Sequence, residues 1–146
     1  MHRCLVIANL TLPGAALARA IRTRLERGPC YFHIVVPLGG RHDLYADVLN
    51  ALEGETHTEA DTRREAETRL EQTLTSIRAA GGEAHGETTD ADPLTAVRAT
   101  LQKHEFDEIV VSTLPEPISH WLRLDLPAKI HHIVDIPVTH VISTTH

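Results

Sequence analysis

Hydrophobic residues occur along this chain either in short continuous runs or at helical spacing. The continuous runs lie at residues 4–8, 31–36 and 107–112. Short apolar runs of this kind are typical of parallel strands that helices cover on both faces. Two further strands are predicted at residues 83–88 and 137–142. The first of these has few large apolar side chains, which favours a position at the edge of the sheet.

Between these runs, apolar residues recur every three or four positions, as on a helix with one buried face. One helix is predicted between Gly14 and Gly28, and a long one over residues 59–80, where Gly81 and Gly82 end it. A third helix is predicted over residues 93–105, with Asp92 as its N-cap and a proline at its first position. Short helices are predicted over residues 43–52 and before the last strand.

This alternation of strands and helices predicts one α/β domain over residues 1–146, a three-layer αβα sandwich around a mostly parallel sheet. Right-handed crossovers and a reversal after three strands give the strand order 3-2-1-4-5. The switch point then lies between strands one and four. Ligands of open α/β sheets bind at such points, because the carboxyl ends of the strands leave a crevice there. The crevice is bounded by residues 9–14 and 112–125.

The candidate ligand-binding residues lie around this crevice and at the end of the second strand. Trp121 is the only tryptophan, and it either lines a pocket or anchors a loop onto the sheet. Arg123 and Lys129 flank Asp125; they either attract an anionic ligand or are solvated charges, and Asp125 is predicted to cap the following helix. The candidates are Asn9, Thr11, Pro37, Ser112, Thr113, His120, Trp121, Arg123 and Asp125.

Composition narrows the class of function. The net charge of -6 and the 3% of aromatic residues exclude the basic, stacking surface of a nucleic-acid-binding protein. No stretch approaches the roughly 20 apolar residues of a membrane span, and no signal peptide is visible. The two cysteines, Cys4 and Cys30, lie in apolar runs and are predicted to be reduced core thiols. A cytoplasmic protein is therefore expected.

Neither a metal site nor a catalytic constellation is predicted, and no cofactor is expected. Of the 11 histidines, His131 and His132 are adjacent, so on a helix they point about 100° apart and cannot share one ion. Ser119 stands beside His120, but no GxSxG elbow is present, and adjacency in sequence does not let one residue activate the other. Hydrolysis is accordingly not predicted.

Three local patterns are similar to those of the universal stress protein family. Cys-Leu-Val-Ile-Ala-Asn-Leu-Thr at residues 4–11 resembles that family's first strand, residues 107–111 resemble its fourth, and residues 136–138 resemble the Pro-Val that opens its last. The resemblance covers nearly the whole chain and implies the adenine nucleotide α-hydrolase-like fold. The ATP-binding branch of the family carries GxxGx9G(S/T) after its fourth strand. In this chain Ser112, Pro115 and Asp125 stand at the three glycine positions.

The resemblance implies a cytosolic, non-catalytic ligand-binding or regulatory module of the stress-response type, for which a nucleoside-like ligand is expected. ATP binding in the glycine-motif manner is not expected, because prolines delete amide donors and Asp125 adds negative charge. Two alternatives stay open: a nucleotide-binding or hydrolysing enzyme of the wider group, or an interaction protein whose crevice its own Leu114, Ile118 and Trp121 fill. A homodimer is predicted through the last strand, an exposed edge. Its edge residues are Val138, His140, Val141 and Ile142.

Overall fold

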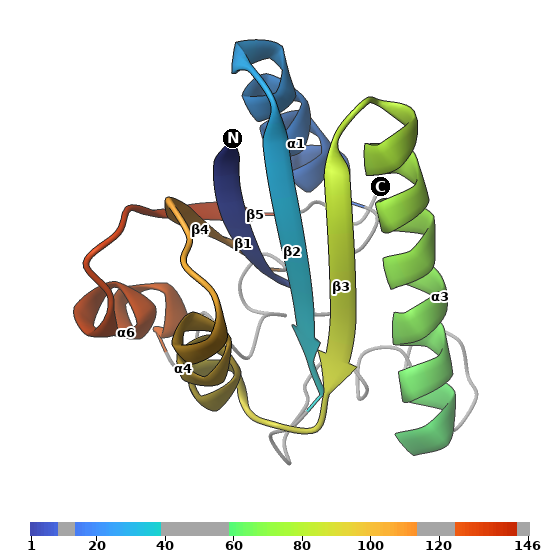
Figure 1. Ribbon diagram of the computed structural model, residues 1–146. Coiled ribbons are helices and arrows are strands. Elements are labelled where there is room, and N and C mark those ends of the chain that lie inside the picture. Colours follow the sequence, from blue (N-terminus) through green and yellow to red (C-terminus); the bar gives the residue numbers. More distant parts are fainter. Residues whose placement is uncertain (9–13, 39–58, 114–124, 143–146) are drawn as a thin grey trace.

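The computed structural model describes residues 1–8, 14–38, 59–113 and 125–142. Its centre is a parallel sheet in the order β3-β2-β1-β4-β5 (Figure 1). This confirms the predicted fold class and strand order. The predicted helix over residues 43–52 lies outside the described residues. The strands are β1 (His2–Ala8), β2 (Cys30–Pro37), β3 (Glu83–Thr89), β4 (Glu108–Thr113) and β5 (Val138–Ile142).

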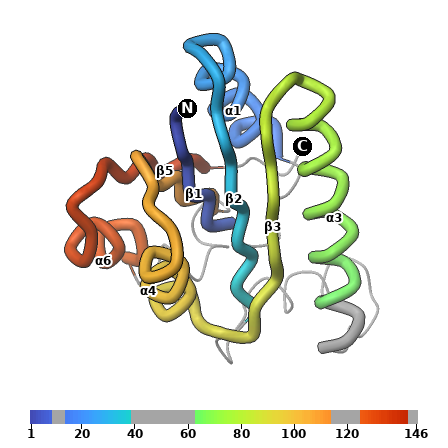
Figure 2. Tube along the Cα trace, viewed as in Figure 1, coloured from blue at the N-terminus to red at the C-terminus, as the bar shows by residue number. Residues whose placement is uncertain are grey.

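Helices cover both faces of the sheet, as the three-layer prediction requires (Figures 1 and 2). α1 (Ala15–Arg27) and α3 (Glu59–Ala79) pack on one face, and α4 (Pro93–Lys103) and α6 (Leu126–Ile133) pack on the other. Right-handed crossovers cause this division. The chain moves from β1 towards β3 with helices on one side, then returns past β1 to β4 and β5 with helices on the opposite side.

The central strand β1 shows why its sequence is continuously apolar. Cys4, Val6 and Ala8 belong to the core beneath α1 and α3, while Leu5 and Ile7 belong to the core beneath α4 and α6. Successive side chains of a strand point to opposite faces, so a strand covered on both faces needs an apolar residue at every position. Cys4 is buried, as is Cys30, and both are free thiols, as predicted.

The helix ends lie close to the predicted positions. Gly28 follows α1 with φ of 154°, and Gly81 follows α3 with φ of 96°, a backbone conformation that glycine adopts without steric cost. Asp92 caps α4, because its side chain accepts a hydrogen bond of 2.9 Å from the Thr95 amide. α4 ends at Lys103, before the predicted residue 105, because the extended backbone of His104 lets the chain carry Phe106 into the core.

None of the helices in the described part of the chain has the length and apolar character needed to cross a membrane.

Candidate functional site

The predicted switch point is present at the carboxyl edge of the sheet. β1 and β4 are neighbours, and Ala8 at the end of β1 is partnered with Ser112 near the end of β4. α1, which follows β1, lies on one face of the sheet, and α6, which follows β4, lies on the other. Adjacent strands are therefore followed by helices on opposite faces of the sheet, which is the arrangement that opens a ligand crevice in α/β folds.

Ser112 and Thr113 are both fully buried at the end of β4. They point to opposite faces of the sheet. Ser112 shares its face with Val110, which belongs to the core beneath α1 and α3, and Thr113 shares its face with Val111, which belongs to the other core. The Thr113 hydroxyl lies 2.7 Å from Nε2 of His140 on β5. Burial lowers the pKa of the His140 imidazole, which favours the neutral form that this hydrogen bond suits. The Thr113 hydroxyl therefore ties β4 to β5.

Pro37 marks the other side of the same edge. It is the last residue of β2, is buried, and is partnered with Thr89 at the end of β3. The next amide, of Leu38, donates a hydrogen bond of 2.7 Å to the Thr89 carbonyl and holds the two strand ends together. The backbone around Pro37 is therefore held in place at this edge of the sheet, where we expect a ligand to bind.

Asp125 stands at the N-cap of α6, but the prediction that its side chain caps the helix is wrong. Its backbone is left-handed, with φ of 55° and ψ of 43°, and its side chain makes no capping hydrogen bond. A capping aspartate normally has an extended backbone, which directs its carboxylate at the free amides of the first turn. Only its carbonyl takes part, by accepting a hydrogen bond from the Lys129 amide at 3.1 Å. The left-handed region favours glycine, the residue expected at this position from the resemblance to the ATP-binding branch.

Several predicted ligand residues lie outside the described residues, and the structure does not place them. They are Asn9, Thr11, His120, Trp121 and Arg123, together with the crevice-filling Leu114 and Ile118.

β5 forms one edge of the sheet, since among the described strands it pairs only with β4. Val138 and Val141 are half-buried against the two cores. His140 is more exposed, although its imidazole is partly buried at the contact with Thr113. Ile142 is one of two large hydrophobic side chains exposed in the described part of the chain, at 46%. The predicted dimer edge thus has an apolar residue at its end.

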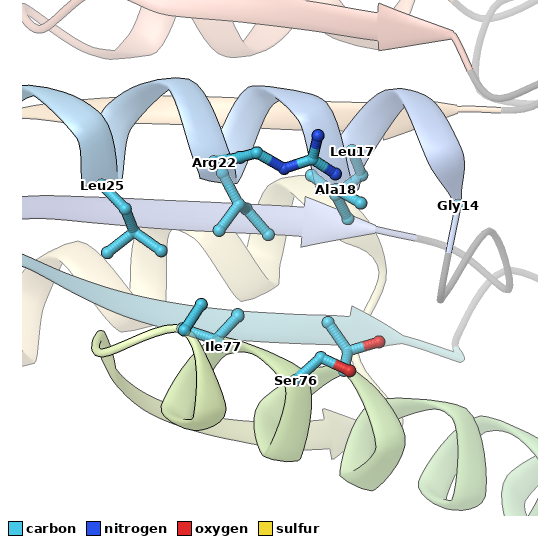
Figure 3. Close-up of a pocket in the computed structure, with 10 residues that line it drawn as sticks. Gly14, Leu17, Ala18, Arg22, Leu25, Ser76 and Ile77 are labelled. Atoms are coloured by element: carbon cyan, nitrogen blue, oxygen red, sulfur yellow. The ribbon is translucent and has the colours of Figure 1, made fainter.

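A groove between α1 and α3 was not predicted from the sequence. It has a volume of about 210 Å³ and runs from Gly14, at the start of α1, past Ile21 to Leu25 and Ala80 (Figure 3). The signal for it was present in the sequence as small residues on the facing sides of both helices. The apolar periodicity of one helix does not reveal which small residues of another helix lie opposite it.

A cluster of rings at the other end of the sheet was also missed. His33 of β2 is partnered in register with His85 of β3, and its Nδ1 lies 3.3 Å from the Tyr31 hydroxyl. The ring centroid of His104 lies 6.0 Å from that of His33, and Nε2 of His33 lies 3.9 Å from the Glu87 carboxylate. Burial lowers the pKa of His33. No group of three or more metal-ligating side chains suited to an ion is found among the described residues.

No protein-family model matches the sequence, and no curated protein matches it. Solved structures do match. The universal stress protein from Archaeoglobus fulgidus superposes with a TM-score of 0.57 at 18% identity, over 97% of this chain and 93% of its own. Its structure in complex with dAMP gives 0.54 at 18% identity, over 97% and 99% of the two chains.

Two further matches come from other proteins. A universal stress protein family protein from Arabidopsis thaliana with AMP bound gives a TM-score of 0.50 at 13% identity, over 99% of this chain and 94% of its own. A deacetylase of teicoplanin biosynthesis gives 0.55 at 11% identity, over 93% of this chain and 65% of its own. The chain therefore has the fold of the universal stress proteins, as the resemblance in its strand motifs implied.

Proposed function

We propose that this chain is a universal-stress-protein-like, non-catalytic module that binds a nucleoside-like ligand at the carboxyl ends of β1 and β4. The observation that carries the proposal is the switch point itself. β1 and β4 are adjacent, and the helices that follow them, α1 and α6, lie on opposite faces of the sheet. It is supported by the dAMP and AMP complexes of the two proteins with this fold from Archaeoglobus and Arabidopsis.

The ligand we propose has few phosphates or none. A phosphate chain needs several backbone amides and a local positive potential. Pro115 and Pro117 have no amide hydrogen, and the exposed carboxylate of Asp125 stands at the start of α6. A nucleoside is bound through its base and sugar, which hydrogen-bonding side chains and strand-end backbone groups recognise without a phosphate loop.

Calorimetry with adenosine, AMP and MgATP tests the proposal on the parent chain and on Asp125→Gly. We expect adenosine or AMP to bind, and MgATP to bind no more tightly than AMP. Tight, magnesium-dependent ATP binding by the parent would overturn the ligand class. If none of the three binds, and the protein purified without added ligand shows no small molecule by native mass spectrometry, the interaction-protein alternative holds instead.

The same samples test the absence of catalysis. The deacetylase match shows that enzymes share this fold, so the fold does not decide the question. Chromatography of each nucleotide after prolonged incubation with the protein should return it unchanged. Conversion of a nucleotide to a hydrolysed product that is released from the protein would support the enzyme alternative.

We also propose that the module is a cytoplasmic homodimer joined through β5. The exposed edge of β5 and the exposed Ile142 at its end support the dimer. The free, buried thiols of Cys4 and Cys30 support a reducing compartment.

A further inference from the structure

The groove between α1 and α3 exists because neither helix supplies side chains large enough to fill it. Ala18 faces it from α1, Thr73 and Ser76 face it from α3, and Ala80 faces it from the turn directly after α3. At 1.5 Å per helical residue, the part of α1 from Gly14 to Leu25 extends over about 16 Å. The groove is therefore long and narrow, a shape that suits an extended chain better than a ring system.

The floor and one end of this groove are apolar. Leu17, Ile21 and Ile77 form the floor and are buried in the core beneath the two helices. Leu25 closes the end nearest the amino edge of the sheet, where a Cβ added at Gly82 would lie 3.0 Å from Leu25 Cδ2 and 2.9 Å from Ile77 Cγ2. Filling this space with an apolar chain would remove hydrophobic surface from water.

The other part of the groove carries a cation. Arg22 is the only charged residue among those that line it, and in the described part of the chain it has no ion pair or hydrogen bond. Figure 3 shows its side chain running along α1 towards Ala18, away from the Leu25 end. Ser76 is exposed on the opposite wall, and among the described residues its hydroxyl has no hydrogen-bond partner.

The start of α1 adds to this positive potential. Gly14, which lines the groove, is the N-cap of α1 and has no side chain to satisfy the first amides, and the first turn contains no acidic residue. The helix dipole therefore favours an anion at the same end as the Arg22 guanidinium. Arg24, a neighbouring cation on α1, is occupied by Glu108 and does not contribute.

We propose that this groove binds an aliphatic carboxylate, with the acyl chain on Ile21, Leu25 and Ile77 and the carboxylate on Arg22. A guanidinium binds a carboxylate with charge-assisted hydrogen bonds. The hydroxyls on the wall are those of Ser76 and Thr73, and the Thr73 hydroxyl already donates to the Arg69 carbonyl, so the groove offers little to the many polar groups of a sugar or nucleotide. Gly14 also bounds the crevice at the ends of β1 and β4, but the other residues that line the groove lie along the facing sides of α1 and α3 and at the end of α3. The proposal therefore does not rest on the proposed function.

Decanoate is the probe, titrated below its micelle concentration by calorimetry. The parent should bind it, decanol should bind at least tenfold more weakly because it has no charge, and acetate should not bind because it has no chain. Arg22→Gln should weaken decanoate binding at least tenfold. Arg19→Gln is the matched control, since Arg19 is an exposed arginine on the same helix that does not line the groove.

A second variant tests the cavity without touching the charge. Ser76→Leu places a large side chain at an exposed position of the wall and should abolish decanoate binding, while adenosine binding and the melting temperature are kept. Equal binding of decanoate and decanol, equal effects of Arg22→Gln and Arg19→Gln, or full binding by Ser76→Leu would overturn the proposal. So would a loss of self-association in Ser76→Leu without any decanoate binding by the parent, because the groove would then be covered by a second copy of the chain.

Discussion

Arg24 on α1 and Glu108 at the start of β4 form an ion pair across the amino edge of the sheet. Nη2 of Arg24 lies 3.3 Å from Oε2 of Glu108, and Nε of Arg24 contacts Oε1. His2 approaches the same carboxylate, with Nε2 at 3.3 Å from Oε1. Burial acts to raise the pKa of Glu108, but Arg24 and His2 hold it below its usual value. The pair therefore fixes α1 to the strand on which the switch point depends.

Glu108→Gln should lower the free energy of unfolding by about 2 kcal/mol, because it leaves the guanidinium of Arg24 without its counter-charge. The Arg24 and Glu108 side chains are only 13% and 14% exposed, so water compensates little for the loss. Urea denaturation at pH 7 measures the change. Glu105→Gln, at an exposed neighbouring position, is the control and should change stability by less than about 0.5 kcal/mol. Equal effects of the two substitutions would show that the pair is solvated in solution.

Stability should fall as the pH drops below about 6.5, in part because of His33. Burial lowers the pKa of folded His33, whereas the unfolded chain titrates near 6.5. Below that pH the unfolded state binds more protons, so acid favours unfolding until the pH passes the lowered folded pKa. His104 and His85 oppose protonation, and Glu87 favours it.

The matching experiment measures unfolding free energies between pH 7.5 and 5.5. His33→Gln should flatten the pH dependence without removing it, because burial also lowers the pKa of His140. A parent slope that His33→Gln does not alter would contradict the assignment to His33.

Asp125 should tolerate glycine and not alanine. A non-glycine residue in the left-handed region costs roughly 1–2 kcal/mol, and a short polar side chain such as aspartate reduces this cost by local hydrogen bonding. Asp125→Ala should therefore destabilise the chain by about 1 kcal/mol, while Asp125→Gly should match or exceed the parent. Both variants lose the same carboxylate, so a difference between their thermal melts reports the backbone alone. Identical melts would mean that φ of 55° is not kept in solution.

Dimerisation through β5 should be weakened by a proline substitution, and the effect on stability should depend on whether the lost amide points outward or towards β4. The Pro137 carbonyl accepts a hydrogen bond from the Ile109 amide, so residues 137, 139 and 141 direct their backbone groups at β4. The amides of residues 138, 140 and 142 then point outward, because successive residues alternate. Ile142→Pro removes an outward donor from each copy and should weaken a dimer about tenfold with little change in stability.

Val141→Pro is the companion variant. It removes a donor that faces β4 and should lower the unfolding free energy as well as association. Light scattering and analytical ultracentrifugation at tens of micromolar protein measure both variants. A parent that is monomeric at that concentration would disprove the dimer.

The element order and the sheet topology were determined by the sequence. A continuous apolar run such as residues 4–8 has one stable environment, a strand covered on both faces, and the alternation with helices then leaves a parallel sheet. Right-handed crossovers, together with a reversal after the third strand, give the order of the strands and the switch point. The sequence also determined Asp92 as the cap of α4 and Gly28 as the end of α1, because a capping residue interacts only with the few residues next to it in the chain.

The tertiary structure decided what depends on residues far apart or on backbone shape. Arg24 and Glu108 are 84 positions apart, and nothing in either local sequence selects the other as its partner. The groove depends on small residues of two separate helices facing each other, which periodicity along one helix cannot reveal. Asp125 carries a common cap residue type, but its role is set by a left-handed φ. Hydrophobic spacing reports which face of an element is buried, whereas pairing, cavities and strain arise only when those faces are packed together.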